Sequence, residues 1–317
     1  MERDNKKIKF SIIIPVYNEE DNVSILHQEI IQVMKSFSDS FEIIFINDGS
    51  EDNTLVNLKQ LSPVKIINFR KRFGQTQALE AGIKNSKGKY IISLDGDLQN
   101  DPKEIPNLYN KLISDDLDVV SGWRKNRKDG FFKKISSRIM CRLRRLMIND
   151  RIHDSGCTLK IYKQECFKGV NLYGEIHRFI PAILKIKGFK IGELEVNHRY
   201  RTNGKTKYNW KRGVKGLLDL FSVWFWYKYS NRPLHLFGGL GLLLIFFSFI
   251  SASIAFYQKI FQNQSLSDTA ITELSMFSFF VGSLFFVFGL MSDILIKIYF
   301  SSTRDSSYNI KEIIENE

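Results

Sequence analysis

The sequence predicts an α/β domain built on a mostly parallel sheet, followed by interfacial helices and a two-helix transmembrane hairpin. Three observations carry this prediction. Apolar, β-prone runs alternate with helical patterns through the first 122 residues, acidic or amide residues follow several of the strands, and two long apolar segments lie after Pro233. Alternation of strands and helices favours a parallel sheet with helices on both faces.

The elements of the expected sheet domain follow the chain in order. Strands are predicted at 8–14, 41–46, 64–69, 90–94 and 118–122. Apolar residues at helical spacing predict helices after Asn18, after Ser50 and over 75–86, and Pro102 occupies a favoured first-turn position of a fourth. The first, second and fourth strands end in acidic or amide residues. These polar groups are therefore expected at one sheet edge, where open α/β sheets bind ligands.

The fourth of these strands ends in Asp95-Gly96-Asp97. Two carboxylates with no His or Cys nearby suit Mg²⁺ or Mn²⁺ better than zinc. Because Mg²⁺ takes one or two protein carboxylates and completes its shell with substrate phosphates, the pattern predicts a metal-bound nucleotide diphosphate. A solvated acidic turn is the alternative for an isolated Asp-Gly-Asp.

The pattern changes after Gly122. A basic loop at 124–130 precedes Phe131 to Ile148, a basic amphipathic segment that is expected either in a membrane interface or packed on its own domain. Strands are predicted at 158–162 and 190–198, and a helix begins near Gly174. Its His177 and Arg178 are expected either to contact an acceptor substrate or to cap the helix. The aromatic segment from Trp210 to Tyr229 also suits a membrane interface.

Leu234 to Tyr257 and Leu274 to Phe300 are each long and apolar enough to cross a bilayer. The connecting loop has one Lys, whereas Lys and Arg flank the other ends, so the positive-inside rule places the large domain on the cytoplasmic side of an inner membrane. Asp293 and Lys297 lie four residues apart and are expected to pair. The N-terminus shows no signal peptide pattern.

Charge is unevenly distributed along the chain. The formal net charge of the chain is +12, but the segment from Pro233 onward contains four Lys/Arg and seven Asp/Glu. The basic first part suits phosphate-rich ligands, an anionic membrane surface or nucleic acid. Nucleic acid is not an expected partner, because the acidic strand ends would repel a polyanion. Three cysteines without metal spacing predict reduced thiols.

Five short motifs resemble those of family-2 glycosyltransferases. They are Ile-Pro-Val-Tyr-Asn-Glu-Glu (14–20), Asn-Asp-Gly-Ser-Glu-Asp-Asn-Thr (47–54), Arg-Phe-Gly-Gln-Thr (72–76), Leu-Asp-Gly-Asp-Leu-Gln-Asn-Asp (94–101) and Asp-Ser-Gly-Cys (154–157). With the membrane hairpin, they resemble the polyprenyl-phosphate glycosyltransferases, such as dolichol-phosphate mannose synthases and bactoprenol glucosyltransferases. A Gln-x-x-Arg-Trp motif is absent, which counts against processive polysaccharide synthesis.

The resemblance implies a GT-A type domain with a divalent metal, Mg²⁺ or Mn²⁺. The expected division is a catalytic domain at 1–208, an interfacial helix at 209–232, the hairpin at 233–300 and a cytoplasmic tail at 301–317. Asp48 would bind uracil or ribose beside Pro15, Tyr17 and Glu19, and Asp95 and Asp97, helped by Gln99, would hold the metal. The residues expected to bind the two phosphates are Arg124, Arg199, Arg201 and Lys205.

Asp154 matches the candidate base of the family. A lipid phosphate that behaves as a phosphomonoester has a second pKa of ~6 and is mostly ionised at neutral pH. Asp154 is therefore expected to orient the acceptor or to take a residual proton.

The implied reaction is inverting transfer of a hexose to undecaprenyl or another polyprenyl phosphate, which gives a lipid-linked monophospho-sugar for cell-envelope glycosylation. Glucose from UDP-glucose is the first choice, and mannose from GDP-mannose or a modified aminoarabinose are alternatives. An inactive nucleotide-sugar-binding membrane protein is a remote alternative, which the intact Asp95, Asp97 and Asp154 oppose. A homo-oligomer and a separate lipid-sugar flippase are further partners left open.

Overall fold

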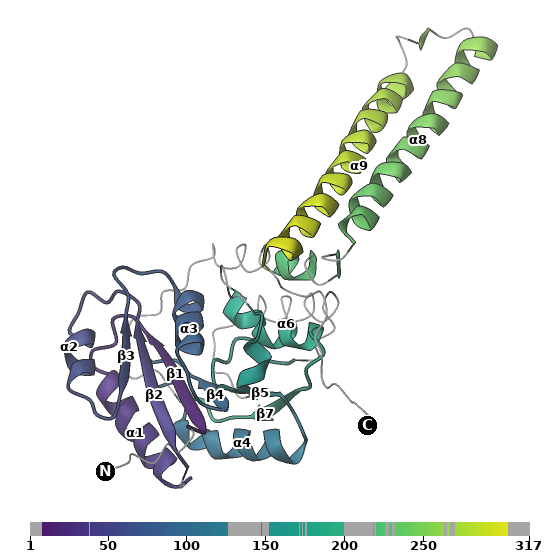
Figure 1. The fold of residues 1–317 in the computed structure, drawn as a ribbon. Helices are drawn as coiled ribbons and strands as arrows, with labels where there is room; N and C mark the ends of the chain where they lie inside the picture. The colour runs from purple at the N-terminus through teal and green to yellow at the C-terminus, as the bar shows by residue number, and fades with distance from the viewer. Residues whose placement is uncertain are drawn as a thin grey trace. The chain divides into compact units, whose positions relative to one another are not determined.

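The computed structural model describes residues 8–125 except 38, residues 152–199 except 171, 173 and 175, and residues 232–303 except 263, 264 and 267–269, together with 147, 218, 220–225, 228 and 229 (Figure 1). The chain divides into two compact units, Met1–Val223 and Trp224–Glu317, which are described separately. The basic segment Phe131 to Ile148, apart from Met147, lies outside the described residues, as do Arg201, Lys205 and the tail after 303.

Seven strands of the first unit form one mixed sheet in the order β3-β2-β1-β4-β6-β5-β7. The strands are β1 (Phe10–Val16), β2 (Phe41–Asn47), β3 (Lys65–Asn68), β4 (Tyr90–Ser93), β5 (Val119–Trp123), β6 (Lys160–Lys163) and β7 (Ile191–Glu195). β1 pairs in parallel with β2 and with β4, and β5 pairs in parallel with β7. The alternating α/β pattern predicted from the sequence is therefore confirmed, with boundaries that differ by a few residues.

Helices cover both faces of this sheet. They are α1 (Val23–Lys35), α2 (Thr54–Lys59), α3 (Gln75–Lys84), α4 (Ile105–Ser114) and α6 (Ile180–Ile186), with short 3₁₀ turns at η1 (Pro102–Glu104), η2 (Gln164–Phe167) and η3 (Ile176–Phe179). The helix expected from Gly174 begins as η3 and becomes α-helical only at Ile180.

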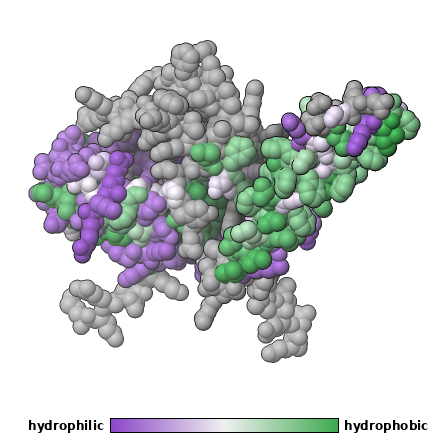
Figure 2. Space-filling view, turned by 90° about the horizontal axis from the view of Figure 1, so that it is seen from above, coloured by the Kyte–Doolittle hydropathy of each residue, from purple (hydrophilic) through white to green (hydrophobic). Residues whose placement is uncertain are grey.

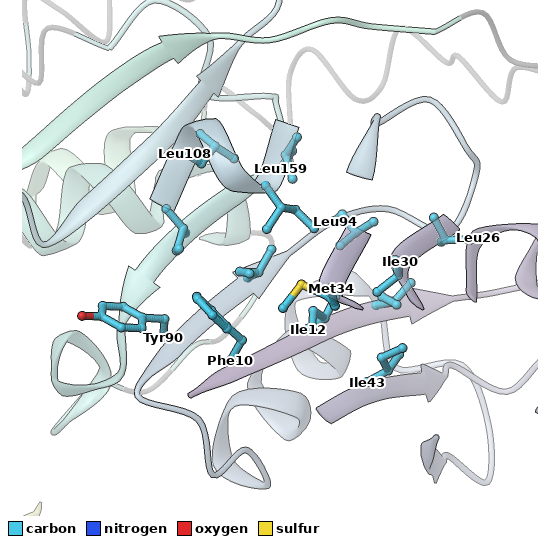
Figure 3. Close-up of a cluster of buried hydrophobic side chains, with 14 of the residues drawn as sticks. Phe10, Ile12, Leu26, Ile30, Met34, Ile43, Tyr90, Leu94, Leu108 and Leu159 are labelled. Carbon is cyan, nitrogen blue, oxygen red and sulfur yellow. The ribbon is translucent and has the colours of Figure 1, made fainter. Parts of the chain in front are cut away.

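Adjacent residues of the central strands pack into opposite cores. Ile12 and Ile14 of β1 lie in a cluster with α1, α2 and α4, whereas Ile13 lies in a cluster with α3 and α6. Figure 3 shows the first cluster, in which Leu26 and Ile30 of α1 meet Ile12 and Ile43 of the sheet. Because side chains alternate between faces along a strand and both faces are buried, the strands are continuously apolar.

β6 is the one strand of the described sheet that pairs antiparallel to its neighbours. It lies between β4 and β5, with Ile161 opposite Ile92 on one side and Val120 on the other. The predicted strand at 158–162 is present, but its insertion between two strands that precede it in the chain was not predicted. This insertion brings the 154–157 motif to the edge where β4 ends.

The described part of the segment from Trp210 to Tyr229 is helical at 218, 220–225, 228 and 229. Leu220 and Val223 are buried in the core cluster that contains α3 and α6, whereas Leu218 and Phe221 are exposed. One side of this amphipathic stretch therefore packs on its own domain, and the other remains available to an interface.

The second unit is a helical hairpin of α8 (Pro233–Gln262) and α9 (Ala270–Thr303). Hydrophobic residues gather over its surface, while hydrophilic residues predominate over the sheet domain (Figure 2). Only 22% of the most apolar stretch of α8 and 11% of that of α9 are buried. A core helix of a soluble protein would be mostly buried, so the two helices fit a membrane protein.

Small residues line the contact between α8 and α9. A Cβ on Gly241 would lie 2.6 Å from the carbonyl oxygen of Gly282, and the Ser275 hydroxyl donates to the carbonyl oxygen of Ser248 at 2.9 Å. The backbones therefore approach closely, as is common where small residues mediate helix packing in membranes. The expected pair is also present, since Lys297 Nζ lies 2.7 Å from Asp293 Oδ2 on α9.

Candidate active site

Polar residues follow the carboxyl ends of β1, β2 and β4 at one edge of the sheet. The parallel registers pair Val16 with Asn47 and Ile13 with Ser93, so the segments after these strands emerge side by side. The loop after β1 is joined to the loop after β2, because Asn18 N donates to Ser50 Oγ at 3.0 Å and Glu51 N donates to Asn18 Oδ1 at 2.9 Å. The convergence predicted from the strand ends is therefore present.

Asp48, the residue expected to bind uracil or ribose, is 4% exposed and fixes a neighbouring loop. Its carboxylate accepts hydrogen bonds from the backbone N–H groups of Phe73 at 2.6 Å and Gly74 at 2.9 Å. Gly49 next to it has φ +68°, and a Cβ there would lie 2.5 Å from the backbone carbon of Lys71. The Asn-Asp-Gly-Ser motif thus holds the 70–74 loop against the end of β2, since only glycine fits there.

The residues expected beside Asp48 lie on the loop after β1. Pro15 and Tyr17 are partly exposed, and the guanidinium of Arg72 lies 4.2 Å from the centroid of the Tyr17 ring. Glu19 Oε2 accepts a hydrogen bond from Asn22 Nδ2 at 2.6 Å. A cation over an aromatic face is attractive, so Tyr17 and Arg72 give this end of the site a flat, positively charged wall.

Asp95 and Asp97 follow β4 as predicted and influence each other electrostatically. Burial and, secondly, the charge of Asp97 raise the pKa of Asp95 to about 6, although a hydrogen bond from Thr158 and the charges of Arg124 and Lys160 oppose the shift. Some of the Asp95 side chain still reaches solvent. Leu98, in the same loop, adopts the left-handed region at φ 59°. Such strain in a non-glycine residue concentrates at functional sites.

The donor set fits a divalent cation. The charge of Asp97 disfavours the ionised form of Asp95, and a cation between the two carboxylates would favour that form. Gln99 N donates to Asp97 Oδ1 at 3.2 Å, which keeps Gln99 beside this pair. Among the described residues, no three His, Cys, Asp or Glu side chains form a complete metal cluster. Asp95, Asp97 and Gln99 would therefore need substrate phosphates to complete the shell, as is usual for Mg²⁺.

Gln75 is a site residue that was not singled out from the sequence, although it lies within the 72–76 motif. Its Nε2 donates to Asp95 Oδ1 at 2.7 Å from the first turn of α3. The next residue, Thr76, hydrogen-bonds through its hydroxyl to His177 Nδ1 at 2.8 Å, and both are buried. His177 therefore joins η3 to α3, while its neighbour Arg178 is exposed.

Asp154, the candidate base, is 6% exposed and is bound by Arg124 through two parallel hydrogen bonds. Arg124 Nε donates to Oδ2 at 2.7 Å and Nη2 donates to Oδ1 at 3.0 Å. The backbone N–H groups of Arg124 and Gly156 donate one further bond to each oxygen. A carboxylate can accept about four hydrogen bonds, so these four donors occupy the acceptor capacity of Asp154. Burial tends to lower the pKa of Arg124, but the hydrogen bond and charge of Asp154 raise it overall.

Two further residues fix the turn that carries Asp154. The Glu193 carboxylate of β7 accepts hydrogen bonds from the backbone N–H groups of His153 at 2.9 Å and Asp154 at 3.2 Å. Lys160 of β6 is 3% exposed and donates to the carbonyl oxygen of Cys157. Burial lowers the pKa of Lys160, while the charges of Cys157, Asp154 and Asp95 oppose that shift. Neither residue was predicted. Glu193 lies 39 positions from Asp154, and the sequence around Lys160, three positions after Cys157, does not indicate that its ammonium is buried against that motif.

The four basic residues expected at the phosphates have different surroundings. Arg124 lies with Asp154 beside Asp95, whereas the guanidinium of Arg199 is engaged by Glu29 of α1 and by Asp101. Arg201 and Lys205 lie outside the described residues. Cys157 and Cys166 are free and buried, which agrees with the predicted reduced thiols; Cys141 lies outside the described residues.

Residues 11–170 match the family model described as Glycosyl transferase family 2. Along nearly its whole length the chain is similar to a dodecaprenyl-phosphate galacturonate synthase of Rhizobium johnstonii. The two are 34% identical over 320 residues, which cover 98% of this chain and 95% of the relative.

Solved structures share the fold of the first unit. A glucosyl-3-phosphoglycerate synthase of Mycobacterium tuberculosis, in complex with Mn²⁺ and UDP-glucose, superposes with a TM-score of 0.55 at 14% identity, over 71% of this chain and 82% of the other. A mannosyl-3-phosphoglycerate synthase of Rubrobacter xylanophilus gives a TM-score of 0.56 at 12% identity, over 69% and 74%. At these identities the likeness establishes the fold, a GT-A fold, and no more.

Proposed function

Because this chain belongs to glycosyl transferase family 2, we propose that it transfers a hexuronate of the galacturonate type from a nucleoside diphosphate sugar to a polyprenyl phosphate. The observation that carries the proposal is the full-length similarity to a dodecaprenyl-phosphate galacturonate synthase, which includes the membrane hairpin. The sequence does not decide the sugar, and glucose from UDP-glucose is only the first choice among the sugars that the motifs leave open. The product of the relative makes a hexuronate our first choice, with glucose and mannose as the sugars to be tested against it.

Asp95, Asp97 and Gln99 are proposed to hold Mg²⁺ or Mn²⁺ against the diphosphate of the donor. When bound, the metal neutralises and orients the leaving group. The raised pKa of Asp95, caused by burial and by the charge of Asp97, supports this assignment. Asp48, Pro15, Tyr17 and Glu19 are proposed to line the nucleoside end, with Asp48 acting chiefly through the 70–74 loop that it holds.

In the proposed step an oxygen of the acceptor phosphate attacks the anomeric carbon of the sugar. The bond from that carbon to the diphosphate oxygen breaks, and its electron pair leaves with the nucleoside diphosphate. A single displacement inverts the anomeric carbon. The acceptor phosphate, with a second pKa of ~6, needs little deprotonation at neutral pH. We assign Arg124 to the acceptor phosphate through Nη1 and the second N–H of Nη2, because Asp154 uses only Nε and one N–H of Nη2.

Asp154 is proposed to hold Arg124 rather than to act as a general base. Its two oxygens already accept four N–H donors, so it cannot receive a proton without losing one of them. A carboxylate bound to a guanidinium in two parallel hydrogen bonds fixes the plane of that guanidinium. Asp154 thereby holds Arg124 within electrostatic reach of Asp95.

The hairpin is proposed to span the cytoplasmic membrane with the catalytic domain on the cytoplasmic side. A polyprenyl phosphate that left the headgroup layer would expose its chain at ~0.8 kcal/mol per CH₂. The active site must therefore reach the membrane surface. The exposed residues Leu218 and Phe221 of the amphipathic stretch before α8 suit such an interface.

The proposal is tested with membranes that contain the full chain. They are incubated with undecaprenyl phosphate, Mn²⁺ and radiolabelled UDP-galacturonate, UDP-glucose or GDP-mannose, and the lipid is then extracted. We expect labelled lipid chiefly from UDP-galacturonate. Equal or faster labelling from UDP-glucose would overturn the choice of sugar. Absence of labelled lipid from all three donors would overturn the proposed transfer of these sugars to undecaprenyl phosphate.

A further inference from the structure

Arg199 joins three elements that are far apart in the sequence. Its Nη1 lies 2.8 Å from each carboxylate oxygen of Glu29 on α1, and its Nη2 lies 2.7 Å from Oδ1 of Asp101, the residue that precedes η1. The partners are 170 and 98 residues away in the chain. The Asp101 side chain is 12% exposed, while those of Arg199 and Glu29 retain about a third of their surface (29% and 30%).

The backbone of Arg199 is also bound to the loop that carries the acid pair. Arg199 N donates to the carbonyl oxygen of Gln99 at 2.9 Å, and His198 forms an antiparallel bridge with Asn100. Gln99 N in turn donates to Asp97 Oδ1 at 3.2 Å. A short series of bonds therefore connects Arg199 to Asp97 and Gln99.

The charge of this cluster argues against the role expected for Arg199 from the sequence. One guanidinium lies between two carboxylates, so the three side chains carry a net charge of −1. Pairing with Glu29 and Asp101 raises the pKa of Arg199 in spite of the opposing effect of burial. A phosphate would have to displace both carboxylates and would meet an excess of negative charge.

We propose that Arg199 is a positioning residue that fixes the Asp97–Gln99 loop for binding of the metal and nucleotide. Asp101 also accepts a hydrogen bond from the backbone N–H of Lys103 at 3.0 Å. Through Asp101, the Arg199 guanidinium therefore holds the end of the Asp97–Gln99 loop at the start of η1. Glu29 supplies the rigid support, because α1 packs on the sheet core through Leu26 and Ile30. This inference rests on the proposed metal-dependent transfer.

Arg199→Met and Arg199→Lys in the full chain test this role, with binding of UDP in the presence of Mn²⁺ measured by calorimetry. We expect Arg199→Met to weaken Mn²⁺-dependent UDP binding by about tenfold to hundredfold, because loss of a group that orients metal ligands typically has effects of this size. Arg199→Lys should recover only part of the loss, since one ammonium cannot replace the planar fork. The KM for polyprenyl phosphate should be unchanged.

Two variants make the result independent of the folding of Arg199→Met. Glu29→Gln alters the same cluster from α1 and should weaken Mn²⁺-dependent UDP binding in the same direction but by less. Lys111→Met removes an exposed pair with Asp115 on α4 and should have no effect. If both Arg199→Met and Glu29→Gln bind UDP normally, or if only the acceptor KM rises, Arg199 is not a positioning residue for this loop.

The binding measurement separates this inference from the proposed reaction. Calorimetry uses neither sugar nor acceptor, so a wrong choice of hexuronate or lipid would leave its result intact. Failure of the wild-type chain to bind UDP with Mn²⁺ would contradict the metal-dependent reaction and, with it, the role of Arg199.

Discussion

The Asp97 carboxylate shares the β4 loop with Asp95 and accepts a hydrogen bond from Gln99 N. We predict that Asp97→Asn lowers sugar transfer at least about a hundredfold, because the amide neither carries charge nor holds a hard cation well. Folding should be intact, since loss of its charge relieves repulsion with Asp95. Transfer assays and thermal denaturation check this, with Asp115→Asn on the exposed end of α4 as the control.

Because the Asp154 carboxylate already accepts four hydrogen bonds, we expect its substitution to affect acceptor binding and not proton transfer. Asp154→Asn should raise the KM for polyprenyl phosphate about tenfold, because the ion pair that holds Arg124 is lost. The shape of the pH–rate profile should stay the same. Arg124→Lys should show the same KM effect, and the two changes together should be far from additive because they break one ion pair. Loss of the acidic limb of the profile in Asp154→Asn would instead identify a general base.

The buried ammonium of Lys160 makes folding stability depend on pH. Burial lowers its pKa in the folded state below the ordinary 10.5, so the unfolded chain binds more protons and stability increases as pH rises toward that value. The groups that surround it are Asp95, Arg124, Asp154 and Cys157. Wild type should therefore gain stability relative to Lys160→Met between about pH 7 and about pH 9.5. Thermal denaturation at both pH values tests this; a constant difference would contradict it.

The site residues that the sequence predicts are those whose role can be recognised from their immediate neighbours in the chain. Asp95 and Asp97 are recognisable because they end an apolar strand, and Asp154 because it opens a short motif. Gln75, Lys160 and Glu193 act on residues that are 20, 3 and 39 positions away, through orientations that no spacing rule encodes. The partners of Arg199 could not be inferred either, since an exposed loop arginine and a cross-linking arginine have the same sequence pattern.

At the scale of elements, the close contact of α8 and α9 depends on glycine. A Cβ on Gly241 would lie 2.6 Å from Gly282 O, whereas one on Gly239 would meet nothing within 4 Å. We predict that Gly241→Leu separates the helices and that Gly239→Leu does not. Oxidative cross-linking of Ser248→Cys with Ser275→Cys, in a background without native cysteines, should fall several-fold only in the Gly241→Leu variant.

Equal cross-linking in both glycine variants would show that the hairpin tolerates a wider contact. The comparison is matched, because each change introduces the same side chain on α8 two positions apart. It therefore separates loss of packing from any effect of leucine on insertion into the membrane.

The elements themselves were largely predictable, because continuous apolar runs and helical spacing are local properties. The position of β6 was not. Its four residues satisfy a strand pattern whichever neighbours they have, and the choice of β4 and β5 depends on long-range packing of Ile161 with Ile92 and Val120. The same limit applies to α6, where the propensity for a helix is present from Gly174 but the first turn closes as η3.

For the whole molecule, we predict that the loop between α8 and α9 lies across the membrane from the catalytic domain. The prediction rests on the two apolar helices and on the distribution of Lys and Arg. Ser265→Cys, in a background without native cysteines, should react with an impermeant thiol reagent applied outside the cytoplasmic membrane. Ser62→Cys, on an exposed turn of the catalytic domain, should react only after permeabilisation. The reverse pattern would overturn the topology.

The ion pair between Arg124 and Asp154 has a consequence for how such enzymes diversify. β5 and β6 are neighbouring strands, and the residues between them in the chain separate Arg124 from Asp154 by 30 positions. The ion pair therefore joins the two ends of this connection next to the sheet. Since the cost of closing a loop grows only slowly with its length, the intervening stretch can lengthen, shorten or change composition with little strain on the sheet. Variants or chimaeras that change only the length or composition of this stretch should therefore keep the sheet and the Arg124–Asp154 ion pair.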